Sequence, residues 1–139
     1  MTKQGLAAIV ETKGNPHTHL ILRGGGGRSN FDAESVAAAV RALSAASVNE
    51  GLMVDCSHAN SGKDPAKQPL TAEQLALQIE AGNRHIIGIM LESFLLAGSQ
   101  PVGPKETLVY GQSITDGCMS WDSTVGVLDR LAQAARSRR

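Results

Sequence analysis

Three short apolar runs in this chain each end in a charged or small polar group. The runs and their endings are Leu20-Ile21-Leu22 before Arg23 and four glycines, Leu52-Met53-Val54 before the segment Asp55 to Ser61, and residues 86–91 before Glu92-Ser93. Apolar runs this short, bounded by polar residues, predict buried strands. Parallel sheets carry their functional side chains at the carboxyl ends of their strands. The pattern therefore predicts a parallel sheet with a site along one edge.

Helical patterns separate these runs. In residues 32–46 apolar side chains recur at helical spacing, with Asn30 or Asp32 available as the N-cap. Residues 71–74, Thr-Ala-Glu-Gln, have the form of a capping box and predict the start of a second helix. A third helix is expected from about Trp121. Strand and helix thus alternate along the chain, which predicts an α/β fold with right-handed crossovers.

The length of the chain limits how much of such a fold it holds. Its 139 residues, 42% of them hydrophobic, are enough for one domain with its own core. A complete (β/α)₈ barrel takes roughly 200 residues or more. We therefore expect residues 1–139 to form one domain that is part of a barrel. Residues 6–10 resemble a further strand, which we expect to pair with residues 20–22 as a hairpin.

Composition argues against several classes of partner. The 13 basic and 13 acidic residues cancel, and the one Trp, one Tyr and two Phe are too few for a stacking surface, so nucleic acid is not expected. The longest apolar run is far shorter than the roughly 20 residues that cross a bilayer, so no membrane span is expected. The two cysteines lack the spacing of a disulfide framework and no leader pattern precedes them, which predicts a cytoplasmic protein.

Three residues at or beyond the strand ends are candidate ligands of one divalent metal ion: His58, Glu92 and Asp116. Mixed nitrogen and carboxylate ligands suit manganese, iron, cobalt or zinc better than magnesium or calcium. Spacing alone leaves other roles open. His58 also fits a structural histidine, Glu92 a carboxylate paired at a strand end, and Asp116 a helix cap.

Two further groups have chemical potential. Arg23 and the glycines that follow it combine a planar donor fork with a backbone that an anion can approach closely, which suggests phosphate or carboxylate binding. A flexible turn is the alternative, since the run lacks the lysine of a P-loop and the spacing of a dinucleotide fingerprint. Cys56, near His58, fits a thiolate nucleophile, although a small packed cysteine in a strand is the commoner case. Cys118 is interpreted as a packed thiol.

Four ordered motifs combine these features. They are Ile-Leu-Arg-Gly-Gly at 21–25, Asp-Cys-Ser-His-Ala-Asn-Ser at 55–61, Gly-Ile-Met-Leu-Glu-Ser at 88–93, and Tyr-Gly-Gln-Ser-Ile-Thr-Asp at 110–116. Together, in order and spacing, they closely resemble the class I 3-deoxy-D-arabino-heptulosonate 7-phosphate (DAHP) synthases. The resemblance covers essentially the whole chain. It implies the C-terminal part of a TIM (β/α)₈ barrel, with three consecutive βα units and an N-terminal hairpin strand.

The resemblance also implies an activity. The family condenses phosphoenolpyruvate with erythrose 4-phosphate and releases phosphate, the first step of the shikimate pathway to aromatic amino acids. By motif position, His58, Glu92 and Asp116 match ligands of the family's divalent metal. Arg23 and His58 match catalytic residues that contact phosphoenolpyruvate, and Asp116 is included among the substrate-binding residues.

The chain also departs from the family pattern. The fourth metal ligand, a cysteine on the first barrel strand, has no counterpart here, nor has the lysine-proline-arginine-threonine segment that holds the sugar phosphate. Phe94 replaces a histidine and Gly62 a serine. We therefore expect a chain that is inactive alone, or active only with a complementing N-terminal part. Besides the two substrates, the expected partner is a second copy of the chain, as a homo-oligomer, or that N-terminal part. The alternatives are a noncatalytic metal- or anion-binding fragment that self-associates through open strand edges, and a related octulosonate phosphate synthase, against which the motif at 110–116 argues.

Overall fold

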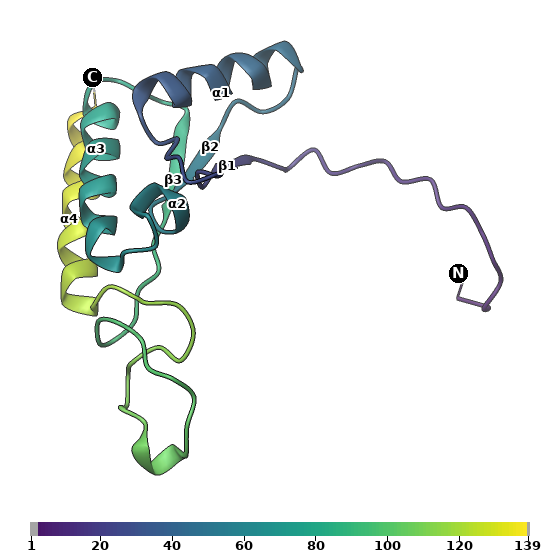
Figure 1. The fold of residues 1–139 in the computed structure, drawn as a ribbon. Helices are drawn as coiled ribbons and strands as arrows, with labels where there is room; N and C mark the ends of the chain where they lie inside the picture. Colours follow the sequence, from purple (N-terminus) through teal and green to yellow (C-terminus); the bar gives the residue numbers. More distant parts are fainter. Residues whose placement is uncertain (1–2, 139) are drawn as a thin grey trace.

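Three parallel strands lie at the centre of the computed structural model, which describes residues 3–138 (Figure 1). The strands are β1 (Leu20–Leu22), β2 (Leu52–Asp55) and β3 (Ile86–Met90), hydrogen-bonded in the order β1-β2-β3. Leu22 lies beside Val54, which lies beside Ile89. The mixed α/β class and the parallel sheet expected from the apolar runs are confirmed. The pairing of β2 with β3 shifts register between Leu52 and Met53. Because the strands are parallel, their carboxyl ends nevertheless meet at one end of the sheet.

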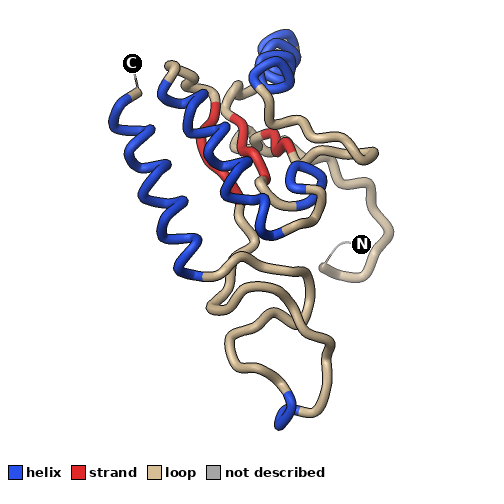
Figure 2. The backbone as a smooth tube through the Cα atoms, turned by 60° about the vertical axis from the view of Figure 1, so that its left-hand side comes forward, coloured by secondary structure: helices blue, strands red, loops and turns tan. Residues whose placement is uncertain are grey.

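Helices follow each strand. Helix α1 (Ala33–Ala45) begins after Asp32, whose carboxylate accepts from the backbone N–H of Ser35. Helices α3 (Gln68–Glu80) and α4 (Trp121–Ser137) lie side by side along the sheet (Figure 2). Ser120 caps α4 by accepting from the N–H of Ser123. Three short turns complete the set: α2 (His58–Ser61), η1 (Pro65–Lys67) and η2 (Lys105–Thr107).

One hydrophobic core joins the sheet to the helices. Its fully buried members include Leu52 and Val54 from β2, Val36 from α1 and Leu75 from α3. Full burial of a side chain of this size contributes roughly 1.5–3 kcal/mol. Side chains alternate faces along a strand, so Ile21, next to the buried Leu22, lies on the other face and is 49% exposed. The helices therefore cover one face of the sheet and leave the other more open.

The second helix begins earlier than its capping box predicts. Helix α3 starts at Gln68, directly after η1, and has Pro69 in its first turn. Thr71 lies inside the helix, where its hydroxyl donates to the carbonyl of Asn60 at 3.3 Å. Proline lacks a backbone N–H and has the φ of a helix, so it fits a first turn well. That signal, and not the capping box, sets the start of the helix.

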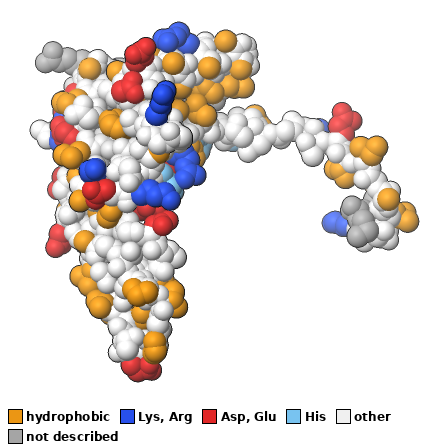
Figure 3. All heavy atoms as spheres, in the orientation of Figure 1, with side chains coloured by type: hydrophobic (Ala, Val, Ile, Leu, Met, Phe, Trp, Pro, Cys, Tyr) orange, Lys and Arg blue, Asp and Glu red, His pale blue; other side chains and the backbone are white. Residues whose placement is uncertain are grey.

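The expected hairpin is also wrong. Residues 6–15 form no strand, and β1 pairs with β2 alone among the described residues. Instead the N-terminal segment runs away from the sheet as an extended arm with hydrophobic side chains on its surface, among them Ile9 and Val10 (Figures 1 and 3). Residues 6–10 are apolar throughout and lack the alternation of a half-buried strand, and alanine is depleted in strands. At the opposite end a long loop, residues 93–120, projects between β3 and α4 (Figure 1) and is held by isolated bridges such as Ser93 to Met119.

A candidate metal and anion site at the strand ends

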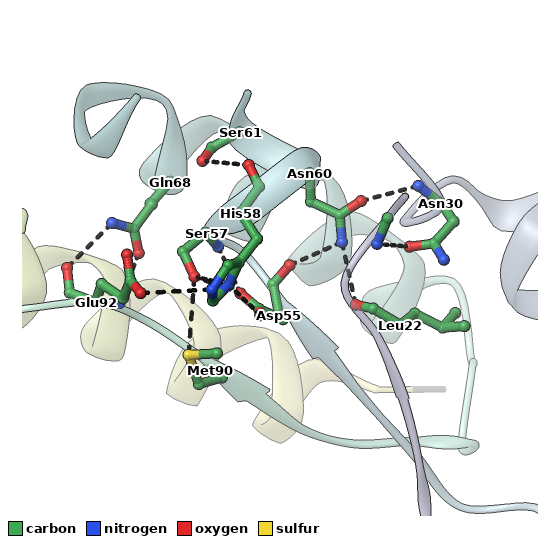
Figure 4. A network of polar contacts seen from close by, with 11 residues as sticks. Leu22, Asn30, Asp55, Ser57, His58, Asn60, Ser61, Gln68, Met90 and Glu92 are labelled. Atoms are coloured by element: carbon green, nitrogen blue, oxygen red, sulfur yellow. Dashed lines mark hydrogen bonds and ion pairs between the residues drawn. The ribbon is translucent and has the colours of Figure 1, made fainter. Parts of the chain in front are cut away.

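The site begins where β2 ends. The strand stops at Asp55, and the chain turns into α2 at His58, whose φ of 48° is left-handed. That conformation costs roughly 1–2 kcal/mol for most residues, although histidine adopts it more readily than bulky residues do. The turn separates two side chains that an extended strand would place on one face: Cys56 is buried in the core, and His58 points towards Glu92 (Figure 4).

Asp55 holds one side of the His58 ring. Its Oδ2 lies 2.7 Å from His58 Nδ1, while its Oδ1 accepts from the Ser57 N–H at 2.8 Å and the Ser57 hydroxyl at 2.5 Å. Asp55 is only 2% exposed, and these bonds satisfy a carboxylate that would otherwise be costly to bury. Because a carboxylate accepts, Nδ1 is the ring nitrogen that donates to Asp55, and Nε2 is the one left to face away from it. This is the usual arrangement of metal-binding histidines.

Glu92 faces that free nitrogen. Its Oε1 lies 3.8 Å from His58 Nε2, and the two side chains are 27% and 24% exposed, respectively. Metal bonds to histidine nitrogen and to carboxylate oxygen are each about 2 Å long, so atoms at this separation suit two ligands of one ion. The structure thus brings together the ends of β2 and β3, as the strand pattern predicts.

Asp116 is not part of this cluster. It is exposed in the long loop after β3, and within residues 3–138 no three His, Cys, Asp or Glu side chains lie close enough together to hold a metal ion. It is not the cap of α4 either, because Ser120 has that role. Two of the three expected ligands therefore meet in the structure.

Arg23 lies directly after β1, exposed, at the start of the glycine loop. The loop closes on itself through paired backbone bonds between Gly25 and Arg28. Gly24 has a φ of 69°, and a Cβ there would lie 2.6 Å from the Arg28 carbonyl oxygen and 2.8 Å from Ala59 Cβ. Only glycine fits at Gly24. Its close contacts with Arg28 and Ala59 hold the backbone next to Arg23 in place.

Asn60 joins the loops that follow β1 and β2. Its Nδ2 donates to the Leu22 carbonyl at 3.1 Å and to the Asp55 carbonyl at 2.7 Å, and its Oδ1 accepts from the Asn30 N–H at 2.8 Å (Figure 4). The side chain of Asn30 in turn accepts from the N–H of Gly24 at 2.7 Å. One buried amide therefore sets the spacing between the residues that precede Arg23 and His58.

Comparison with known proteins identifies the family. The sequence model described as the DAHP synthetase I family matches residues 1–129. The chain belongs to the DAHP synthetase I family. This confirms the resemblance drawn from the four motifs.

Named relatives in the DAHP synthetase I family agree. The chain is 49% identical to the tyrosine-inhibited phospho-2-dehydro-3-deoxyheptonate aldolase of Schizosaccharomyces pombe, covering 100% of this chain and 38% of that protein. It is 46% identical to a phospho-2-dehydro-3-deoxyheptonate aldolase of Corynebacterium glutamicum, with 97% and 38% covered. A solved aldolase of this name from Francisella tularensis superposes with a TM-score of 0.88 at 44% identity, covering 95% of this chain and 38% of that one. The chain thus spans well under half the length of these relatives.

Sequence reasoning missed three polar side chains that support the site in this family member: Asp55, Asn60 and Gln68. Asp55 and Asn60 lie in the motif around His58, so the polar run after β2 carried a signal for them. Gln68 lies outside all four motifs. Its contacts with Glu92 become evident only when α3 and β3 are seen together.

Cys56 is not a nucleophile in this arrangement. Burial, with a smaller effect from the negative charge of Asp55, raises the pKa of the Cys56 thiol to about 12. A thiol with this pKa is protonated at neutral pH, and only the thiolate is reactive. The interpretation as a packed core residue is confirmed. In the described part of this DAHP synthetase I family chain, no helix has both the length and the apolar character needed to cross a membrane.

Proposed function

We propose that this chain is the C-terminal portion of a DAHP synthase barrel and supplies part of the active site that joins phosphoenolpyruvate to erythrose 4-phosphate. The pairing of His58 with Glu92 carries the proposal, since the family motifs name both residues and their side chains face each other at 3.8 Å. The parallel sheet supports the barrel, because such sheets need further strands to close. The three strand-helix units would occupy residues 1–139 as one domain.

His58, Glu92 and Asp116 would hold a divalent ion of manganese, iron, cobalt or zinc. When bound, such an ion would polarise the aldehyde of erythrose 4-phosphate as a Lewis acid. Asp55 would keep the lone pair of His58 Nε2 directed at the ion, as carboxylates do beside metal-binding histidines. The positions of His58 and Glu92, whose side chains face each other at 3.8 Å, support this set of ligands. Asp116 would have to move towards them with its loop.

Arg23 would hold the phosphoenolpyruvate anion. A guanidinium offers parallel donors that match carboxylate and phosphate oxygens, and its fixed charge offsets that of the substrate. Arg23 follows the carboxyl end of β1 and so lies at the same end of the sheet as His58, which supports this role. His58 would lie close to the same substrate.

Metal binding by the isolated chain tests the donor set. Isothermal titration calorimetry with Co²⁺ should detect a site in the wild-type chain that weakens at least tenfold, roughly, in His58→Ala and in Glu92→Ala. Glu34→Ala, which removes an acidic residue from the first turn of α1, is the control and should bind as the wild type does. Equal Co²⁺ affinity in wild type and Glu92→Ala would contradict the assignment.

Catalysis is tested by release of inorganic phosphate from the two substrates with Mn²⁺. The isolated chain should release none, because the family's fourth metal ligand and its sugar-phosphate segment have no counterpart in the sequence. Adding the remaining part of a relative's barrel should restore turnover. Robust turnover by this chain alone would show that the missing contacts are not needed and would refute the proposal of a dependent portion.

A second function has one observation in its favour. Among the described residues β1 and β3 each pair on one side only, so the sheet has two open edges. Open edges recruit strands from other chains. The chain would then be a noncatalytic fragment that binds a metal or an anion and self-associates. Size-exclusion chromatography with metal titration tests this second function, since a monomer without metal affinity excludes it.

A further inference from the structure

Gln68 is a buried polar side chain outside the proposed set of ligands. It is the first residue of α3 and is only 1% exposed, among the largest fully buried side chains of the chain. A buried amide is costly unless its donor and acceptor are both satisfied. Both groups of Gln68 bond to one residue, Glu92.

The two bonds run in opposite directions. Gln68 Oε1 accepts from the backbone N–H of Glu92 at 2.8 Å, and Gln68 Nε2 donates to the backbone carbonyl of Glu92 at 3.0 Å (Figure 4). An amide side chain bonded in this way offers the same donor and acceptor as the backbone of a neighbouring strand.

A substitute is needed at this point because β2 turns away. The backbone N–H of Cys56 still donates to the carbonyl of Met90 at 2.9 Å, and then the chain enters α2. Glu92 lies two residues beyond that bond, with no strand of β2 beside it. Buried backbone groups require partners, and Gln68 provides them from α3.

The two hydrogen bonds of the Gln68 amide fix the backbone from which the Glu92 carboxylate projects. The Glu92 carbonyl also accepts from the N–H of Met119 at 3.0 Å, so the residue is held from two sides. With the backbone held, only the torsions of the side chain place its carboxylate opposite His58 Nε2. A shift of the backbone would move the carboxylate directly.

We propose that Gln68 is a positioning residue that sets the distance between Glu92 and His58. The inference rests on the proposed function in so far as these two residues are metal ligands. It adds a residue from α3, outside the strand-end motifs, to the apparatus of the site.

Gln68→Met tests the role, because methionine has a similar length and lacks both hydrogen-bonding groups. Gln78→Met is the matched control: Gln78 lies on the same helix and donates through its side-chain amide to the Phe31 carbonyl at 2.8 Å, away from the site. Both variants should lower the thermal midpoint. Only Gln68→Met should weaken Co²⁺ binding, by roughly tenfold or more, as loss of a supporting residue does at other metal sites. Equal Co²⁺ affinity in Gln68→Met and wild type would overturn the proposal.

A second measurement needs no metal. Nuclear Overhauser contacts between the His58 ring protons and the Glu92 side chain should be present in the wild type and in Gln78→Met and lost in Gln68→Met. If Gln68→Met does not fold, Gln68→Asn keeps the amide but is one methylene shorter, and the same loss is expected. Contacts of unchanged intensity in the folded Gln68 variant refute the positioning role. A wild-type chain that binds no Co²⁺ contradicts the proposed metal site, and these contacts then decide the role of Gln68 independently.

Discussion

At the scale of single residues, burial separates the two cysteines. Cys56 is buried with its pKa raised to about 12. Cys118, interpreted from the sequence as a packed thiol, is instead partly exposed in the loop after β3. Because only thiolates alkylate, iodoacetamide at pH 8 should modify Cys118 and leave Cys56 intact in the folded chain. Mass spectrometry should find one label in buffer and two in urea. Labelling of folded Cys118→Ser would contradict this.

The residues of the site differ in how far the sequence predicted them. The pairing of His58 with Glu92 followed from their places after neighbouring strands, because parallel strands end at a common edge. The distance of Asp116 from them did not, because its position depends on a long loop whose path is set by contacts that no local pattern encodes. The hydrogen bonds of Asp55 and Gln68 depend on a turn with a left-handed residue and on the packing of α3, which strand periodicity does not reveal.

At the scale of elements, the cap of α4 has a measurable share in stability. The Ser120 hydroxyl accepts from the Ser123 N–H at 3.3 Å and so satisfies one of the free donors at the helix start. Ser120→Ala should lower the free energy of unfolding by about 1 kcal/mol in urea titrations. Ser137→Ala, at the other end of the same helix, is the control and should change it by less than about 0.5 kcal/mol. Equal losses in both variants would argue against a specific cap.

Arg130 joins α4 to α3 and makes the junction sensitive to pH. Its guanidinium forms two bonds each with the carboxylates of Glu73 and Glu80, at 2.7 to 3.0 Å. Hydrogen bonding from Arg130 lowers the pKa of Glu80 below its ordinary 4.5. A lowered pKa stabilises the fold above the unfolded value and loses that effect as pH falls through the folded value.

Thermal midpoints measured from pH 6 to pH 3 check this sign. The wild type should exceed Glu80→Gln in stability at pH 6, and the difference should shrink as the pH falls below 4.5. In an Arg130→Met background the same substitution should show no such trend. A difference that stays constant with pH, or that grows in acid, would contradict the pairing.

The elements themselves were largely predictable, and the errors have physical causes. Three strands and the helices between them follow from periodicity, and capping chemistry narrowed the cap of α1 to Asn30 or Asp32, of which the structure has Asp32. The start of α3 was wrong because Pro69 and the turn before it compete with the capping box at Thr71. The hairpin was wrong because residues 6–10 are apolar throughout and lack the alternation that marks a half-buried strand.

At the scale of the whole molecule, the sheet is covered on one face and open along both edges. Ile21 on β1 and Ile87 on β3 are 49% and 59% exposed, and neither edge strand is paired on its outer side among the described residues. In the proposed barrel these side chains and the unpaired backbone groups of β1 and β3 would contact further strands. In the isolated chain they contact water, which favours association with any chain that offers a complementary edge.

Sedimentation velocity should therefore show association of the wild-type chain that increases with concentration. Ile21→Lys and Ile87→Lys place a charge on each edge strand, so each should shift the population towards monomer, because a buried lysine would have to be desolvated in the interface. Leu70→Lys is the matched control: Leu70 is 68% exposed on α3, outside the sheet, and its substitution should leave association unchanged. If all three lysine variants associate as the wild type does, the open edges are not the interface. If Leu70→Lys alone gives monomers, association proceeds through the helical face.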